Sequence, residues 1–251
     1  MRAHRIWYED FERGDYARWT SRTYNADWGP ESARCREVRF AGERVRSGAR
    51  AHRSQVTCPS HTSVHRGYGG VQLEGEQVLA EYSNRGVGAD ARHGMVNTFW
   101  VWLDVPYDFA DGRWHSFWTV TTDCAYEEEV VTLGLEAPDR RLAPAHVEAT
   151  VRTPGAPPFP LRAWVRITVY VNAHEGELHV WQDGVHVSRS RFSRASRTLC
   201  HWHWGLYASG DNTAITLYED DLSLWVLDEP WSAFEREPWL ESCACGGASG
   251  S

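Results

Sequence analysis

Two histidines and a tyrosine recur at even spacing in a short segment near the end of the chain. The segment reads His201-Trp202-His203-Trp204-Gly205-Leu206-Tyr207. In an extended strand, alternate side chains point to opposite faces, so His201, His203 and Tyr207 share one face while the Trp and Leu residues share the other. An imidazole with an ordinary pKa of about 6.5 accepts a proton at neutral pH, and a phenol donates one. The segment therefore predicts a catalytic acid–base site on one face of a strand and a core on the other.

A second strand, at 162–172, carries aromatic and hydrogen-bonding groups along one face. Small and branched apolar residues alternate there with Trp164, Arg166, Thr168, Tyr170 and Asn172. Aromatic rings offer flat apolar faces on which sugar rings stack, and Arg and Asn bind carboxylates or hydroxyls. We expect Trp164, Tyr170 and Asn172 to bind substrate, with Trp181 on the following strand as a further sugar platform. A solvated outer face with two incidental aromatics explains this strand equally well.

The two strands are expected to supply one site. The prediction places Arg166 on the same concave surface as His201, His203 and Tyr207, where the guanidinium of Arg166 or of Arg85 holds a carboxylate of the substrate. In this interpretation His201 or His203 is the base, and Tyr207 or Tyr170 donates the proton. A structure with both histidines inside the core would remove the site.

The elements that position these residues are β-strands throughout. Segments of period two follow one another along the chain, separated by turn signals such as Asp183-Gly184, and no long amphipathic helix is found. This pattern predicts an all-β, two-sheet sandwich that forms one domain over 1–240, with a Gly/Ser-rich tail at 241–251. The expected strands cover 6–11, 36–40, 49–57, 71–82, 95–105, 115–122, 128–136, 146–152, 162–172, 177–182, 185–192, 201–208 and 213–226.

Composition excludes several classes of partner. The 251 residues carry a net charge of -8, and all 26 basic residues are arginine. The electrostatic field of this net negative charge repels polyanions, and the sequence has no basic tract that would offset it. Nucleic acid is therefore not an expected partner. No apolar run approaches the roughly 18 residues of a membrane helix, so no membrane partner is expected either. The 14 tryptophans suit the core of a sandwich and sugar-stacking platforms.

Six cysteines are spread along the chain without paired C-x-x-C spacing, which favours disulfides over a zinc site. Cys35 with Cys58 and Cys124 with Cys200 are candidate bridges, although six cysteines allow many pairings. Disulfides persist in oxidising compartments. We therefore expect an extracellular or periplasmic protein whose export signal is not present in this chain.

Several segments resemble concanavalin A-like jelly-roll polysaccharide lyases of the alginate, glucuronan and heparin lyase type. The segment 175–184 resembles their "G-x-L-x-V-W-x-D-G" hairpin. The segments 204–207 and 216–222 resemble "K-x-G-x-Y … v-y-x-D-D-v", while 99–106 resembles "y-x-f-x-l-x-l-P" and 8–12 the first strand. The resemblance spans nearly the whole chain. It implies a jelly roll that binds a polysaccharide, in this case an acidic, uronate-containing one, and cleaves it by β-elimination without a metal.

The catalytic motifs of that family are altered in this sequence. The "R-S-E-L" motif corresponds to Leu79-Ala80-Glu81-Tyr82, which keeps Glu81 and has Arg85 nearby, so both are candidate substrate-binding residues. The "Q-x-H" pair falls near 119–123, where neither residue occurs, and histidines replace the Tyr and Lys of "Y-x-K-x-G-x-Y". The resemblance therefore leaves two hypotheses: a lyase with histidine chemistry, or a non-catalytic carbohydrate-binding, lectin-like module.

Other chemistries are less well supported by the residues. Glucanases of this fold use "E-x-D-x-x-E", and Glu127-Glu128-Glu129 lacks that spacing. A metal held by His201, His203 and a third ligand such as His115 or Asp123 is the weaker alternative to a sugar groove. No cofactor is expected, apart from a structural calcium ion that the acids in 210–213 or at 220–221 would allow.

Overall fold

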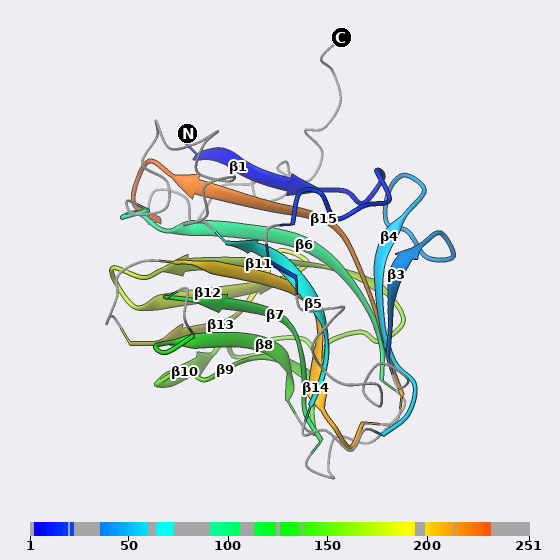
Figure 1. The fold of residues 1–251 in the computed structure, drawn as a ribbon. Helices are drawn as coiled ribbons and strands as arrows, with labels where there is room; N and C mark the ends of the chain where they lie inside the picture. Colours follow the sequence, from blue (N-terminus) through cyan, green and yellow to red (C-terminus); the bar gives the residue numbers. More distant parts are fainter. Residues whose placement is uncertain are drawn as a thin grey trace.

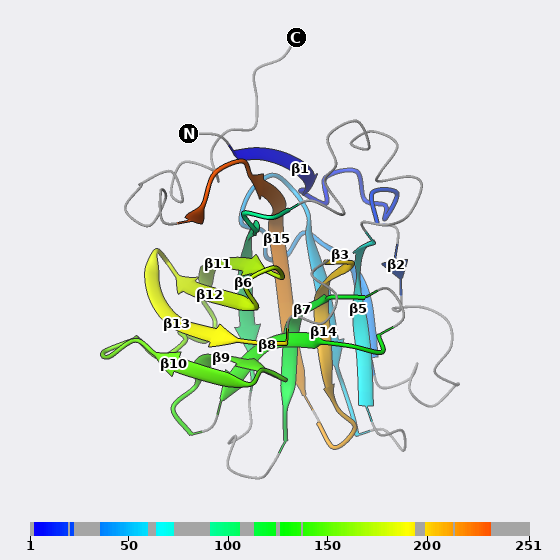
Figure 2. The ribbon, with the colours of Figure 1, turned by 90° about the vertical axis from the view of Figure 1, so that its left-hand side faces the viewer.

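The structure, a computed structural model, describes residues 3–19, 21–22, 36–59, 64–72, 91–105, 113–123, 126–136, 138–193, 199–212 and 214–231. These residues form fifteen strands in two sheets, sheet A with nine strands and sheet B with six. The sheets lie face to face, as Figures 1 and 2 show from two directions. The predicted all-β sandwich is confirmed.

Sheet A runs in the order β10-β13-β12-β11-β6-β15-β4-β3, and β1 also pairs with β15. Its strands are β1 (Ala3–Glu9), β3 (Arg36–Ala41), β4 (Ala51–Val56), β6 (Met95–Asp104), β10 (Ala149–Arg152), β11 (Trp164–Asn172), β12 (Glu177–Gln182), β13 (Val185–Arg191) and β15 (Ile215–Leu227). Sheet B runs in the order β2-β5-β14-β7-β8-β9. Its strands are β2 (Ser21–Arg22), β5 (Val64–Gln72), β7 (His115–Thr121), β8 (Val130–Glu136), β9 (Arg141–Ala145) and β14 (His201–Ser209).

One apolar cluster fills the space between the sheets. Val165, Ile167 and Val169 of β11 belong to it, and so do Trp202 and Trp204 of β14. Alternation along each strand turns these residues inward and their neighbours outward. Because the inward faces of β11 and β14 meet in the same cluster, the outward faces of the two strands point away from each other.

A buried amide links the sheets inside this core. Asn97 of β6 is fully buried, and its Oδ1 accepts hydrogen bonds from the indole Nε1 of Trp118 at 2.7 Å and of Trp204 at 3.1 Å. Its Nδ2 donates to the carbonyl oxygen of Ser223 at 2.7 Å. Indole N–H groups are costly to bury without acceptors, so Asn97 allows two tryptophans to lie directly behind the outer face of sheet B.

The short β2 and all of β9 were not predicted, and β5 was predicted only in part; for β5 and β9 the reason is composition. Residues 64–70 contain three glycines and read as a loop, yet they form most of β5. At Gly70 a Cβ atom would collide with the Trp202 carbonyl oxygen, so glycine permits the close approach of β5 to β14. Strand β9 contains Pro144 and lies at the edge of sheet B, where a missing N–H is tolerated. The part of the expected strand 71–82 beyond Gln72 lies outside the described residues.

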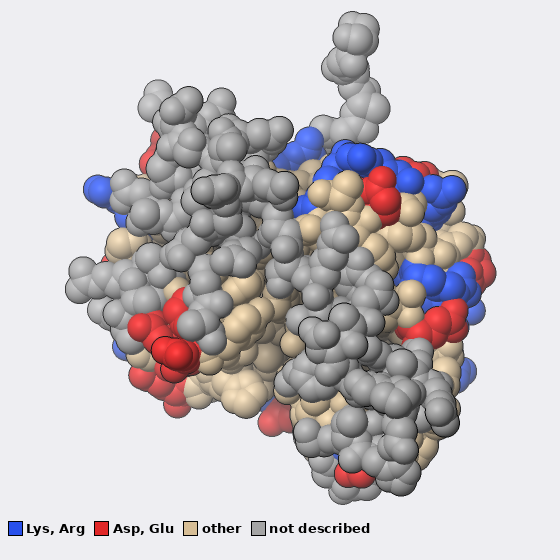
Figure 3. All heavy atoms as spheres, in the orientation of Figure 1, with Lys and Arg blue, Asp and Glu red and all other residues tan. Residues whose placement is uncertain are grey.

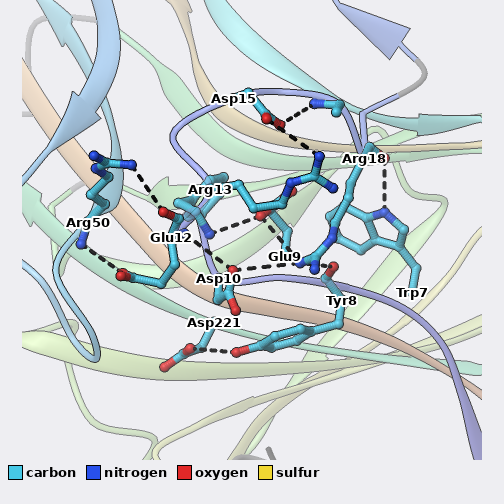
Figure 4. Close-up of polar contacts among 12 residues, drawn as sticks. Trp7, Tyr8, Glu9, Asp10, Glu12, Arg13, Asp15, Arg18, Arg50 and Asp221 are labelled. Carbon is cyan, nitrogen blue, oxygen red and sulfur yellow. Dashed lines mark hydrogen bonds and ion pairs between the residues drawn. The ribbon is translucent and has the colours of Figure 1, made fainter.

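The acidic residues near Asp221 tie the first strand and a loop to β15. Tyr8 donates a hydrogen bond to Asp221 Oδ1 at 3.1 Å (Figure 4), and Ser47 donates one to the same atom at 2.9 Å. Asp220 Oδ2 accepts from the backbone N–H groups of Arg46 and Ser47 at 2.8 and 3.2 Å. In the part of the chain that the structure describes, no three His, Cys, Asp or Glu side chains are grouped as a metal site requires. The acids at 220–221 hold protein donors in this arrangement.

Surface charges near β3 and β4 are paired. Arg39 forms ion pairs with Glu37 and Glu43, and Arg53 pairs with Glu37. Blue and red spheres accordingly lie side by side on this part of the surface in Figure 3. Exposed pairs of this kind contribute only about 0–1 kcal/mol each and do not mark a binding site.

Candidate active site

The outward face of β14 carries the predicted histidines. Trp202, Trp204 and Leu206 lie in the core, as expected, and His201 and His203 lie on the opposite face. Both imidazoles are buried there by rings that cover them from outside, Tyr126 above all. Because neither histidine belongs to the apolar core, the predicted site on this face of β14 remains possible.

Six rings form a continuous line across this face, which we call the aromatic line. In order they are Tyr126, His201, His203, Tyr68, Tyr207 and Trp114, with successive ring centroids 4.6, 5.3, 5.0, 5.7 and 4.8 Å apart. Tyr126 stacks on His201 with an interplanar angle of 20°. The two rings at the ends, Trp114 and Tyr126, are each 41% exposed, so both offer surface to a ligand.

One hydrogen bond in the line joins an acid to a base. The Tyr126 hydroxyl lies 3.1 Å from Nε2 of His203. Burial, and to a lesser degree the neighbouring His201, lowers the pKa of His203 to about 3. The imidazole is therefore neutral at pH 7, so one of its ring nitrogens carries no proton and can accept the hydrogen bond of the phenol.

Burial of His203 has a consequence for stability. A neutral buried imidazole favours folding above its ordinary pKa of about 6.5, and this contribution is lost as pH falls toward the lowered value. For His203→Phe we expect the slope of unfolding free energy against pH, between about pH 4 and 6.5, to fall by roughly 1.4 kcal/mol per unit. Urea unfolding across this range measures it, with exposed His146→Phe as control. An unchanged slope in His203→Phe would contradict the burial of a neutral imidazole.

The prediction that Arg166 shares a surface with His201 and His203 is wrong. Arg166 lies on β11 in sheet A, between β6 and β12, whereas the histidines lie on β14 in sheet B. Its outward face points away from theirs because the inward faces of both strands meet in the core. Trp164 and Asn172 lie on this same outward face of sheet A, so they cannot bind a sugar held at His203.

Tyr170 and Trp181 do not belong to the sugar site either, because a second, small hydrophobic cluster buries both side chains. Their rings pack against Trp231 at centroid distances of 4.6 and 5.0 Å on the outer face of sheet A. The hydroxyl of Tyr170 donates to the carbonyl oxygen of His93 at 3.2 Å. Tyr170 therefore cannot be the proton donor of the β14 site.

Two predicted substrate-binding residues, Glu81 and Arg85, lie outside the described residues. Three residues of the aromatic line were missed by the sequence analysis, namely Tyr126, Tyr68 and Trp114. Tyr126 follows strand β7 in a turn, Tyr68 lies within the glycine-rich β5, and Trp114 directly precedes β7. Period-two alternation on β5 would have placed Tyr68 on the outer face, had 64–72 been interpreted as a strand.

Cys58 and Cys200 are both disulfide-bonded. The other four cysteines lie outside the described residues. The two candidate pairings therefore stay predictions, while disulfide formation at two of the six positions is confirmed. Within the described ranges, no helix is long and apolar enough to span a membrane.

Comparison with known proteins identifies the fold. No protein-family model and no curated protein matches the sequence. Among solved structures, the chain is similar to an endo-β-1,4-glucuronan lyase from the fungus Trichoderma reesei, at 15% identity and a TM-score of 0.58, over 88% of this chain and 95% of that one. It is similar to the cellulose-induced protein Cip1 at 12% identity and a TM-score of 0.54, over 86% and 95% of the two chains.

An alginate lyase of polysaccharide lyase family 7 matches more loosely, with a TM-score of 0.47 at 11% identity over 74% of this chain and 81% of that one. At these identities the likeness concerns the fold alone. The chain has the jelly-roll fold of polysaccharide lyases, as the resemblance of its motifs predicted.

Proposed function

We propose that this protein binds an acidic polysaccharide along the outer face of sheet B and cleaves it beside a uronate by β-elimination. The observation that carries the proposal is the hydrogen bond of 3.1 Å between the Tyr126 hydroxyl and His203 Nε2, within a line of six rings. Tyr126 is partly exposed and can touch a substrate, while His203 lies beneath it. The pair therefore combines a reactive group at the surface with a proton acceptor behind it.

The proposed reaction uses these groups in order. The Tyr126 oxygen takes the proton from C5 of the uronate as its own proton passes to His203 Nε2. The C4–O bond then breaks, a C4=C5 double bond forms, and the leaving oxygen receives a proton from Tyr207. His201, stacked on the Tyr126 ring at 4.6 Å, is a positioning residue that fixes the ring over the strand.

The C5 proton becomes removable only when the charge of the adjacent carboxylate is offset by donors. Arg166 cannot do this from sheet A. Arg85, which follows β5 in the sequence, is the other arginine that the sequence offered for this role. We therefore keep Arg85 as the proposed partner of the carboxylate.

The likeness of fold to a glucuronan lyase supports a carbohydrate partner, and disulfides at Cys58 and Cys200 support an extracellular or periplasmic location. The test is incubation with glucuronan, alginate, pectate, hyaluronan and heparin-like polymers, followed by the ultraviolet absorbance of the unsaturated uronate. We expect growth of this signal on at least one polymer, and its loss in the Arg85→Ala variant. A flat signal on the whole panel would refute the lyase.

The second candidate function is a carbohydrate-binding module without catalysis. Two observations favour it: burial lowers the pKa of His203 to about 3, which weakens it as a base, and the aromatic line is a stacking surface that needs no chemistry. Binding of a polymer in affinity electrophoresis without any unsaturated product would establish this function instead.

A further inference from the structure

A hollow of about 540 Å³ adjoins the aromatic line on the outer face of sheet B. It lies beside Tyr207 and extends over β7, β8 and β9. The residues that line it include Trp114, Ser116, Gly134, Glu136, Ala143 and Tyr207. Its volume falls within the roughly 300–1,000 Å³ of small-molecule sites.

Small side chains on neighbouring strands create the hollow. Ser116 of β7 pairs with Gly134 of β8, and Gly134 pairs with Ala143 of β9, so three small residues form a row across the sheet. A Cβ atom at position 134 would collide with the His115 carbonyl oxygen, so glycine is required there. The row continues from Tyr207, which pairs with Ser116, and therefore leads directly out of the aromatic line.

Two features of the lining suit a sugar. Trp114, 41% exposed, packs edge-on against Tyr207 and presents its indole at the wall of the hollow. Ser116 is only 4% exposed, and among the described residues its hydroxyl has no hydrogen-bond partner. A buried hydroxyl without a partner is costly, and a sugar hydroxyl would satisfy it.

The charge of the lining restricts which sugar can bind. Within the described part of the chain, Glu136 is the only Asp, Glu or Arg that lines the hollow, and it is ion-paired with Arg152. Burial lowers the pKa of His115 to about 4, so that imidazole is neutral at pH 7. A uronate placed here would lose hydration and lie near the carboxylate of Glu136, with no arginine among the lining residues, which is unfavourable.

We propose that this hollow is a subsite for an uncharged sugar, so that the polysaccharide carries a neutral unit close to the uronate that is cleaved. The reference to cleavage rests on the proposed function, whereas binding of a neutral sugar in the hollow does not require catalysis. The preferred substrate is then a mixed polymer rather than a uronate homopolymer.

Titration calorimetry with neutral hexasaccharides of glucose, mannose, galactose and xylose, and with an oligoglucuronate, tests the proposal. At least one neutral probe should bind. Trp114→Ala should weaken that binding about tenfold by removing a stacking face. Ala143→Phe should abolish it by filling the hollow, and Val151→Ala, which removes an exposed apolar side chain from sheet A, should leave it unchanged.

A further variant tests whether the charge of the lining excludes a uronate. Glu136→Arg places a cation at the hollow, so it should raise the affinity of the oligoglucuronate while leaving the neutral probe within about twofold. Failure of every neutral probe to bind, or equal binding of the neutral probe to Ala143→Phe, would each overturn the proposal. Binding of a neutral probe, together with a flat ultraviolet signal on the whole panel of acidic polymers, would refute the lyase and leave the subsite standing.

Discussion

Replacing Tyr126 with phenylalanine is expected to lower the rate of unsaturated-uronate formation by about 10²- to 10⁴-fold, the usual contribution of a positioned acid or base. The ring of the variant still stacks on His201, so the fold and the groove are retained while the hydroxyl is lost. His203→Gln should have a loss of the same order, because glutamine fills the position without taking up a proton. The measurement is the initial rate of ultraviolet absorbance on the preferred polymer.

The two groups should act as a unit. If His203 works through Tyr126, the double variant Tyr126→Phe/His203→Gln is no slower than either single variant, and its pH–rate profile matches that of His203→Gln. His174→Ala, in the turn between β11 and β12 of the other sheet, is the matched control and should retain full activity. Losses that multiply in the double variant would show that the residues serve separate steps.

Asn97→Leu is expected to cause the largest loss of stability, about 2–6 kcal/mol, because two indole N–H groups lose their buried acceptor and each costs about 1–3 kcal/mol. For a chain of this size, the midpoint of thermal unfolding should fall by roughly 2–4 °C per kcal/mol. Calorimetry and urea unfolding both measure the effect.

A mutant cycle separates this polar effect from packing. In the background Trp118→Phe/Trp204→Phe, no indole depends on Asn97, so Asn97→Leu should cost much less than in the unmodified protein. Asn212→Leu, at a buried amide outside the core cluster, measures the ordinary cost of removing such a group. An equal cost of Asn97→Leu in both backgrounds would contradict the role of Asn97 as acceptor for the two tryptophans.

The fold was largely predictable because each strand carries its own two-residue period. Val165 and Ile167 alternate with polar neighbours, and Trp202 and Trp204 alternate with histidines, so the inward face of each strand could be identified locally. The Asp183-Gly184 turn was predicted on the same basis, and both residues adopt the positive φ angles, 48° and 82°, of a tight hairpin. The pattern did not predict β9 and most of β5, because their glycines and proline are typical of loops although they pack well at these positions.

The site was predictable only one strand at a time. The face of β14 that bears His201 and His203 was correct, since alternation alone determines it. The prediction that Arg166 shares this face was wrong, because the two-residue period of a strand does not show which sheet the strand joins. Tyr126 carried no periodic signal, since it lies in a turn that folds over β14 only in the tertiary structure.

By itself, then, the sequence determined that this protein is a two-sheet sandwich with two histidines and a tyrosine on one face of a strand, because those features depend on neighbours along the chain. Only the tertiary structure decided that the polar faces of β11 and β14 lie on opposite sides of the core. It also decided that Tyr126 meets His203, that Trp231 covers Tyr170, and that small residues of three strands leave a hollow beside Tyr207. These features join residues far apart in sequence, and the physical reason is that sheet order and register are set by packing between strands rather than by the period within any one of them.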